Sequence, residues 1–352
     1  MQTAVLVGCG AMSEGWLRAI AQINKGAGKT AGAPPVTLVG FVDLDADLAR
    51  KRADQAGYPD AQTGTDLAGM LAALKPDIVF DIVVPQARAQ VVAAAFDAGC
   101  DVLSEKPLAQ DLAQARALDV HRRATGRLHA VVQNRRHLAG IRRARDFLAG
   151  GALGEIAEVH CDFFIAPHFG GFREEMRHVL LHDMAIHTFD AARFVAGIEP
   201  RRAVCLETNP AHSWFAHGAS ASVLFECGAG RVMSYRGSWC ADGMATSWEA
   251  QWRIIGANGT LLWDGNDGFQ AQTVAARTGF LHPCDPCEVP ALGTPLVHEG
   301  HAGVIADFLR ARATGTPPLS DARDNIRSLA MTVAAIESAE TGRFVDIAAD
   351  FT

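Results

Sequence analysis

A lysine followed by a proline ends a short apolar run in the first third of the chain. Val102-Leu103 is the run, and Ser104-Glu105-Lys106-Pro107 follows it. Proline fixes its own φ near about −65° and keeps the residue before it out of the right-handed helical region. The pattern predicts that Lys106 stands just past a strand end and directs its ammonium at a ligand across the sheet edge. An isolated Lys-Pro pair is more often an ordinary surface lysine, so other residues must support this interpretation.

A carboxylate and an imidazole, Asp183 and His187, stand four residues apart in a stretch of helical periodicity from His178 to Phe194. Residues four apart lie on one face of an α-helix, about one turn from each other. A carboxylate placed there can orient an imidazole and adjust its pKa, as a general base near neutral pH requires. A structural histidine is the alternative, and on this segment alone it is the more frequent case.

Two groups of residues raise the alternative of a metal site. His178 and His182 have the four-residue spacing of zinc ligands, but His187 lies about 140° around an α-helix from His182, so one helix cannot direct all of them inward. His282 precedes Cys284-Asp-Pro-Cys287, but a tetrahedral zinc site needs a second ligand pair, and none is evident. We therefore predict no metal, and an ordinary Pro-rich surface loop around the two cysteines.

Two glycines follow a β-branched run near the start of the chain. The run is residues 3–7, the turn reads Gly8-Cys-Gly10-Ala-Met-Ser13, and an amphipathic segment comes next. A strand, a glycine turn and a helix start bring backbone N–H groups close to a pyrophosphate. Ser13 stands where a third glycine is usual. The residues predicted to form this dinucleotide site are Gly8, Gly10, Ala11 and Met12.

Asp43 ends the next apolar run, Val36–Val42. A carboxylate at the tip of the second strand can accept hydrogen bonds from both adenosine-ribose hydroxyls and repels a 2′-phosphate. NAD is therefore the predicted cofactor, although the basic residues 50–52 leave NADP open. An Asp that caps a helix starting near Asp45 is the alternative. The stretch Lys25–Pro35, predicted to be a mobile loop, explains the long spacing between the glycines and Asp43.

Further strands and helices alternate up to residue 133. The expected segments are the strands Asp77–Val83, Asp101–Ser104 and Leu128–Gln133 and the helices Ala87–Ala98 and Asp111–Thr125. Their order predicts a doubly wound parallel sheet of the Rossmann type, whose ligands bind outside the carboxyl ends of the strands. Val84 and Pro85 lie at that edge, and we expect them to contact the cofactor ribose or nicotinamide.

Residues 134–352 are predicted to form a second, α+β domain. A helix at residues 138–149 and a strand at 156–164 precede the Gly-rich loop His168–Arg173, which we expect over the substrate. Several strand-like runs between residues 203 and 263, with turn signals such as Asn258-Gly259, then predict a mainly antiparallel sheet. Two helices, at residues 298–313 and 321–341, close the chain.

Composition narrows the class of protein. The chain has 352 residues, of which 49% are hydrophobic and 20% charged, and its net charge is −7. These values are typical of a two-domain globular protein, and they favour a small metabolite over nucleic acid or an anionic membrane as the partner. No targeting segment and no apolar run of about 18 residues is evident. We expect a cytoplasmic protein whose eight cysteines stay reduced.

Taken together, the motifs resemble a known family. The turn at Gly8, Asp43, Glu105-Lys106-Pro107, Asn134-Arg135-Arg136 and Asp183-x-x-x-His187 occur in the order found in the Gfo/Idh/MocA oxidoreductases, the relatives of glucose–fructose oxidoreductase and inositol dehydrogenase. The resemblance implies a Rossmann domain followed by a domain with a large, open-faced, mainly antiparallel sheet that carries substrate contacts and oligomer interfaces. It therefore also implies a homodimer or homotetramer.

The resemblance further implies an NAD(P)-dependent oxidoreductase of carbohydrate metabolism that acts on a sugar, cyclitol or related polyol. Lys106 matches the lysine of the family's Glu-Lys-Pro motif, with Glu105 beside the cofactor, and Asp183 and His187 match its Asp and His. We expect His187 to remove the hydroxyl proton, Lys106 to hydrogen-bond the same oxygen, and Asp183 to hold His187. Further substrate contacts are expected from Arg135, Arg136 and His168. His182, which precedes Asp183, departs from the family's pattern.

Two other activities fit the same residues. One is a hydrolase or lyase that retains its NAD and oxidises the sugar only transiently. The other is a non-catalytic protein that senses NAD.

Overall fold

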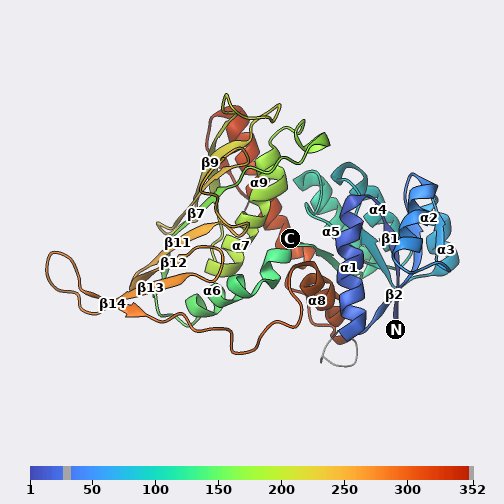
Figure 1. Ribbon diagram of the computed structural model, residues 1–352, viewed down its shortest axis with the longest axis horizontal. Coiled ribbons are helices and arrows are strands. Elements are labelled where there is room, and N and C mark those ends of the chain that lie inside the picture. Colours follow the sequence, from blue (N-terminus) through green and yellow to red (C-terminus); the bar gives the residue numbers. More distant parts are fainter. Residues whose placement is uncertain (27–32, 349–352) are drawn as a thin grey trace. The chain divides into compact units, whose positions relative to one another are not determined.

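The computed structural model describes residues 1–26 and 33–348, shown in Figure 1. Its residues form two compact units. Of the described residues, the first unit comprises Met1–Leu138 and Leu296–Leu329, and the second comprises Ala139–Pro295 and residues 330–348. Residues 27–32 of the predicted loop Lys25–Pro35 lie outside the described residues.

The first unit contains a six-stranded, wholly parallel sheet in the order β3-β2-β1-β4-β5-β6. Its strands are β1 (Gln2–Val7), β2 (Val36–Val42), β3 (Gln62–Gly64), β4 (Ile78–Asp81), β5 (Asp101–Ser104) and β6 (His129–Val131). This strand order is that of a dinucleotide-binding Rossmann fold, so the predicted doubly wound sheet is confirmed. Strand β3 was not predicted, because Gln-Thr-Gly has no apolar residue.

Helices cover both faces of this sheet. They are α1 (Ala11–Gly26), α2 (Ala46–Gln55), α3 (Leu67–Leu74), α4 (Pro85–Asp97) and α5 (Leu112–Thr125). Asp45, Asp66 and Asp111 accept backbone N–H bonds as the N-caps of α2, α3 and α5, which fixes where these helices begin. In the core, the ring of Trp16 in α1 lies 5.5 Å from that of Phe80 in β4.

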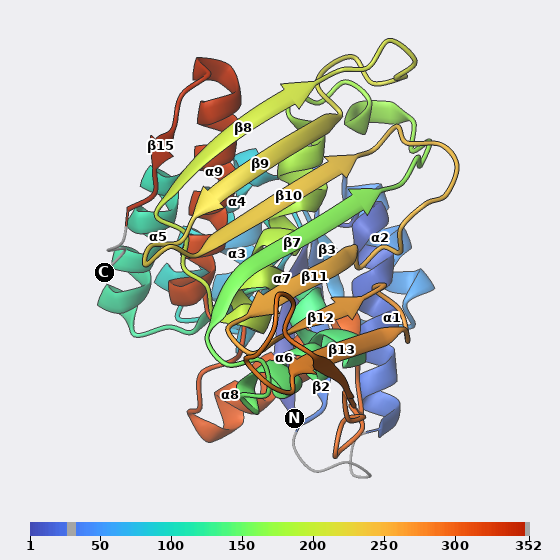
Figure 2. The same ribbon diagram turned by 90° about the vertical axis from the view of Figure 1, so that its left-hand side faces the viewer.

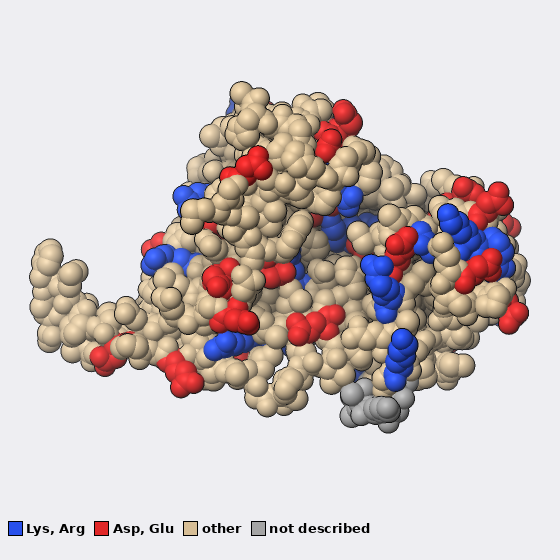
Figure 3. Space-filling model, in the orientation of Figure 1, with Lys and Arg blue, Asp and Glu red and all other residues tan. Residues whose placement is uncertain are grey.

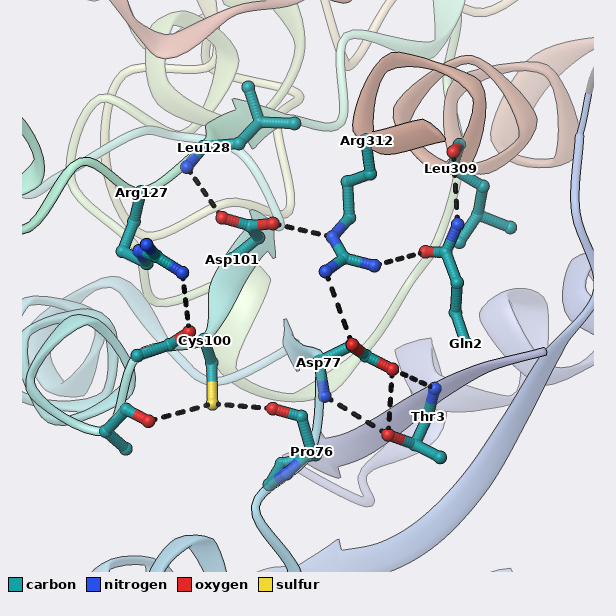
Figure 4. Close-up of polar contacts among 12 residues, drawn as sticks. Gln2, Thr3, Pro76, Asp77, Cys100, Asp101, Arg127, Leu128, Leu309 and Arg312 are labelled. Atoms are coloured by element: carbon teal, nitrogen blue, oxygen red, sulfur yellow. Dashed lines mark hydrogen bonds and ion pairs between the residues drawn. The ribbon is translucent and has the colours of Figure 1, made fainter. Parts of the chain in front are cut away.

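A C-terminal segment also belongs to the first unit. It contains α8 (Gly300–Thr314), which packs against α1, and the start of α9 (Ala322–Thr341). Figure 4 shows Arg312 at the amino ends of three strands, where it donates to Asp101 (2.6 Å) and Gln2 (2.6 Å) and lies 3.6 Å from Asp77. Residues 296–329 thus belong to the first compact unit, whereas the predicted domains 1–133 and 134–352 place them in the second. Sequence periodicity gave no sign that Arg312 would reach β1, β4 and β5.

The second unit contains a nine-stranded sheet in the order β14-β13-β12-β11-β7-β10-β9-β8-β15. The strands are β7 (Ile156–Phe164), β8 (Arg202–Thr208), β9 (Ser220–Glu226), β10 (Val232–Ser238), β11 (Gln251–Gly256), β12 (Gly259–Trp263), β13 (Phe269–Val274), β14 (Cys284–Cys287) and β15 (Val345–Asp346). All neighbours are antiparallel except β7 and β10.

One face of this second sheet is covered and the other is open. The helices α6 (Ala139–Ala149) and α7 (Ile186–Ala196) lie on the covered side, behind the strands in Figure 2. Burial alternates along β8 and β9, and Leu206 and Leu224 on the open side are exposed. The predicted open-faced, mainly antiparallel sheet is confirmed.

The segment around Cys284 and Cys287 is strand β14 and not the predicted loop. Cys284 pairs with Val274 and Cys287 with Ala271 of β13. Residues three apart on a strand point to opposite faces, so the two thiols cannot share one metal ion. The other six cysteines are buried and free.

The predicted helix from His178 to Phe194 starts differently in the structure. A π-helical segment, η3 (Leu180–Ala185), precedes α7, and His178 lies before it with φ 53°. His182 and Asp183 both lie in this π-helical segment. The separation of about 140° between His182 and His187 and the shared face of Asp183 and His187 both assumed an α-helix, so neither follows from the structure here. Within residues 1–26 and 33–348, no group of three or more His, Cys, Asp or Glu is placed to hold a metal, and no helix is both long and apolar enough to cross a membrane.

His178 anchors the start of the segment that carries Asp183 and His187. Its Nδ1 lies 2.6 Å from Glu207 Oε2 in β8, and its Nε2 lies 3.2 Å from Glu340 Oε1 in α9. The hydrogen bond to Glu207 is the main cause that raises the pKa of His178, and burial opposes it. Arg177, 3.9 Å from Glu340, is the other charged group beside this pair.

The His178 cluster predicts a pH-dependent contribution to stability. A raised pKa in the folded state means that the imidazolium stabilises the protein at pH values below about 6.5, and that this contribution is lost as the pH rises through the folded pKa. His178→Asn, which keeps a residue type that tolerates positive φ, should lower the thermal midpoint more at pH 5.5 than at pH 9.0. His217→Asn, which removes an exposed imidazole, is the control. An equal loss at both pH values would contradict this assignment.

Candidate active site

The glycine turn after β1 has the geometry of a phosphate cradle. Gly8 has φ +96°, and a Cβ there would lie 2.7 Å from the carbonyl oxygen of Ile82, so only glycine fits. A Cβ on Gly10 would meet no protein atom within 4 Å, which leaves space for a pyrophosphate beside the N-terminus of α1. Ser13 fills the third position, and its buried hydroxyl donates to the Gly10 carbonyl at 2.6 Å. The predicted contact residues Ala11 and Met12 are exposed at this turn.

Asp43 is held at the tip of β2 by two backbone N–H groups. Its Oδ2 accepts from Cys9 at 2.6 Å, and its Oδ1 accepts from Asp45 at 3.1 Å. The N-cap of α2 is Asp45, so the alternative reading of Asp43 as the helix cap is wrong. The thiol of Cys9 itself is buried, and its burial raises its pKa to about 12, which leaves it unreactive.

The guanidinium groups near Asp43 have other partners. Arg52 donates to the carbonyl of Cys9 at 3.1 Å and pairs with Glu14 at 2.7 Å. Arg50 donates to Tyr58 at 3.3 Å and pairs with Asp54 at 3.0 Å. Both guanidinium groups therefore already bind protein groups and not a 2′-phosphate beside Asp43. These contacts favour NAD over NADP as the cofactor.

The turn after β4 lies at the same sheet edge. Val84 is exposed and precedes Pro85, the first residue of α4. Because β1 and β4 are parallel neighbours, their carboxyl ends bring Val84 and Pro85 close to the glycine turn, as predicted from the strand order.

Glu105 holds the lysine turn after β5. It is only 6% exposed; its Oε1 accepts from Trp16 at 2.8 Å and lies 3.4 Å from His301 Nε2, and its Oε2 accepts the N–H of Lys106 at 3.1 Å. Burial raises the pKa of Glu105, but His301, Trp16 and Lys106 outweigh it and leave the pKa below its usual range. These contacts of the carboxylate are with protein groups, and the position of Glu105 beside the cofactor stays a prediction.

Two residues at this turn were missed by the sequence analysis. Trp16 lies within the amphipathic segment predicted after the glycine turn, which gave it no further role, and His301, from α8, lies 196 positions along the chain after Glu105. Asn134 approaches the other ring nitrogen of His301 at 3.5 Å. No local pattern marks a contact between residues so far apart in sequence.

The two arginines predicted to contact the substrate are buried. Arg136 donates to the carbonyl of Leu319 at 2.5 Å and pairs with Asp324 at 2.6 Å, so its guanidinium fastens the C-terminal segment to the first unit. Arg135 is 8% exposed.

The second unit brings the Gly-rich loop to Asp183. Arg173, at the end of that loop, donates to Asp183 Oδ2 at 2.9 Å, and its guanidinium lies over the rings of Phe169 and Phe172. His168 stacks on Trp214 with ring centroids 3.8 Å apart. Arg173 is therefore a candidate that the sequence analysis missed, although it recognised the loop.

The candidate residues thus form two groups, each within one compact unit. The first unit holds the glycine turn, Asp43, Val84, Pro85 and Lys106 at the carboxyl ends of β1, β2, β4 and β5. The second holds Asp183 and His187 with the loop of His168. Convergence of the two groups on one substrate stays a prediction.

The face shown in Figure 3 carries basic and acidic side chains interspersed over both units. Among the described residues of that face, no extended patch of basic side chains of the kind that attracts nucleic acid is present.

Comparison with known proteins gives two family matches. Residues 3–133 match a family described as oxidoreductases with an NAD-binding Rossmann fold, and residues 141–262 match the GFO/IDH/MocA C-terminal domain.

Individual relatives are similar over long stretches. The chain is 27% identical to D-apiose dehydrogenase of Paraburkholderia graminis, over 97% of this chain and 88% of that protein. It is 31% identical to inositol 2-dehydrogenase of Streptomyces avermitilis, over 53% and 55% respectively. The fold is similar to that of levoglucosan dehydrogenase crystallised with NADH and levoglucosan, with a TM-score of 0.80, 18% identity, and 98% and 99% of the two chains covered.

Both family matches agree with the structure, which has a Rossmann sheet with its glycine turn and an open-faced second sheet. This chain belongs to the GFO/IDH/MocA family of NAD-binding oxidoreductases.

Proposed function

We propose that the protein is an NAD-dependent dehydrogenase that transfers a hydride between nicotinamide and a hydroxyl-bearing carbon of a sugar, cyclitol or related polyol. The observation that carries the proposal is the position of Lys106, held by Glu105 at the sheet edge that also bears the glycine turn. The relatives named as dehydrogenases of D-apiose and inositol support this substrate class.

The bound nicotinamide would supply the hydride chemistry, and the side chains would move and stabilise charge. His187 would take the proton of the substrate hydroxyl, and Lys106 would donate a hydrogen bond to the same oxygen. Asp183 would orient His187, and Arg173, paired with Asp183 at 2.9 Å, would fix the direction of that carboxylate. Positioned acid–base groups of this kind contribute roughly 10²- to 10⁴-fold in rate.

The open face of the second sheet supports a homodimer or homotetramer. Exposed apolar side chains such as Leu206 and Leu224 lie on it, and an exposed sheet face that carries apolar side chains suits symmetric association.

The first experiment is a panel of polyols and sugars with NAD or NADP, followed by absorbance at 340 nm. Steady NADH accumulation with a polyol is the expected result. An enzyme that retains its NAD would convert substrate without NADH accumulation, and a sensor protein would bind NAD without turnover; either outcome would replace the proposal.

Lys106→Ala and His187→Gln should each lower kcat roughly 10²-fold or more while changing the affinity for NAD little. The reason is that both side chains act on the substrate oxygen. Lys75→Asn is a control for loss of a lysine, because Lys75 ends α3 in a left-handed conformation that Asn also adopts. Unchanged turnover in the Lys106 variant would rule out its catalytic role.

Asp43→Asn should raise the ratio of NADP to NAD affinity about tenfold, because a negative charge no longer faces the 2′-phosphate. The asparagine oxygen can still accept the N–H of Cys9, so the turn should stay in place. Asp47→Asn removes an exposed carboxylate in the first turn of α2 and should leave the ratio unchanged. Titration of both cofactors by tryptophan fluorescence gives the two affinities, and an unchanged ratio in Asp43→Asn would exclude this basis of selectivity.

A further inference from the structure

Arg88 is a buried charged residue that the proposed chemistry does not use. It lies in the first turn of α4 and is 1% exposed, and its partner Asp81, the last residue of β4, is 0% exposed. Arg88 Nε lies 2.8 Å from Asp81 Oδ2. Removing two charges from water costs more than such a pair commonly returns, so a buried ion pair is poor evidence of a stabilising role.

The other two nitrogens of Arg88 reach main-chain carbonyls on two separate turns. Nη2 donates to Val83 at 2.7 Å, in the turn that leads into α4. Nη1 donates to Pro107, immediately after Lys106. These turns leave β4 and β5, which are parallel neighbours with Asp81 beside Ser104. A single guanidinium therefore connects the turn of Val84 and Pro85 with the turn of Lys106.

Asp81 fixes the orientation of this guanidinium. Its Oδ1 accepts the N–H of Val83 at 3.2 Å, and Ser104 lies opposite Asp81 on the neighbouring strand β5. Ser104 Oγ in turn lies 3.0 Å from Nε2 of the buried His129. The three acceptors of Arg88 require donors in a planar fork, which arginine offers and lysine does not.

We propose that Arg88 is a positioning residue that sets the Lys106 turn and the Val84–Pro85 turn in register for a bound dinucleotide and its substrate. The role of Lys106 in this inference rests on the proposed function. The connection between the two turns does not. It assigns to Arg88 an effect on cofactor affinity and on the order of two loops, both measurable without a substrate.

Two variants test the proposal. Arg88→Lys keeps a positive charge for Asp81 but loses the fork. Arg88→Met combined with Asp81→Asn removes both charges, so that no lone buried carboxylate is left to unfold the protein. Each should weaken NAD binding about tenfold or more, because charge-assisted hydrogen bonds are lost. In hydrogen–deuterium exchange, residues 82–87 and 105–108 should both exchange faster, with the rest of the first sheet unchanged.

Arg193→Lys is the matched control, because Arg193 is also buried and forms a two-pronged pair with Glu199. It should change neither NAD affinity nor exchange in the two turns. NAD binding and exchange like those of the wild type in the double variant would overturn the proposal, as would faster exchange throughout the sheet. If the wild type binds NAD but oxidises no polyol, the proposed function fails while the affinity and exchange results still decide the role of Arg88.

Discussion

The position of the Lys106 main chain is fixed by buried charged groups on both sides, and the chemistry proposed for the first unit depends on it. On one side, the carboxylate of Glu105 takes the Lys106 N–H and the indole N–H of Trp16 and lies beside His301. On the other side, the carbonyl of Pro107 accepts from Arg88. The flexible side chain of Lys106 therefore extends from a backbone whose neighbouring residues, Glu105 and Pro107, are held by buried groups.

Such burial of charge is costly unless every charged group is paired. The first unit meets this condition with contacts from elements remote in sequence, namely α1, α4 and α8 around one turn. Pre-organised donors and charges of this kind act on a reacting group without reorganisation at the moment of reaction. The cost of placing Glu105, Arg88 and Asp81 out of water is therefore more readily explained by the geometry of the lysine turn than by stability.

Much of the fold was predictable because its signals are local. Apolar runs identify β1, β2, β4 and β5. Strand β3 and helix α3 escaped, since a three-residue polar strand and a short apolar helix lack a clear period. The assignment of residues 296–329 could not be read from the sequence, because it depends on distant partners such as Arg312 with Asp101 and Arg136 with Asp324.

Where the candidate residues lie in the fold was predictable only where the signals are local. Gly8, Asp43 and Lys106 carry their geometry in neighbouring residues, whereas Trp16, His301 and Arg88 act through contacts that no spacing rule encodes. The segment of Asp183 and His187 shows a further limit. Its helical period is visible, but the π-helical turn at Leu180–Ala185 changes the angular step between side chains. The step of 100° per residue therefore does not apply between His182 and His187. Insertions of this kind are frequent at functional sites, so the departure from the regular period supports the role proposed for this segment.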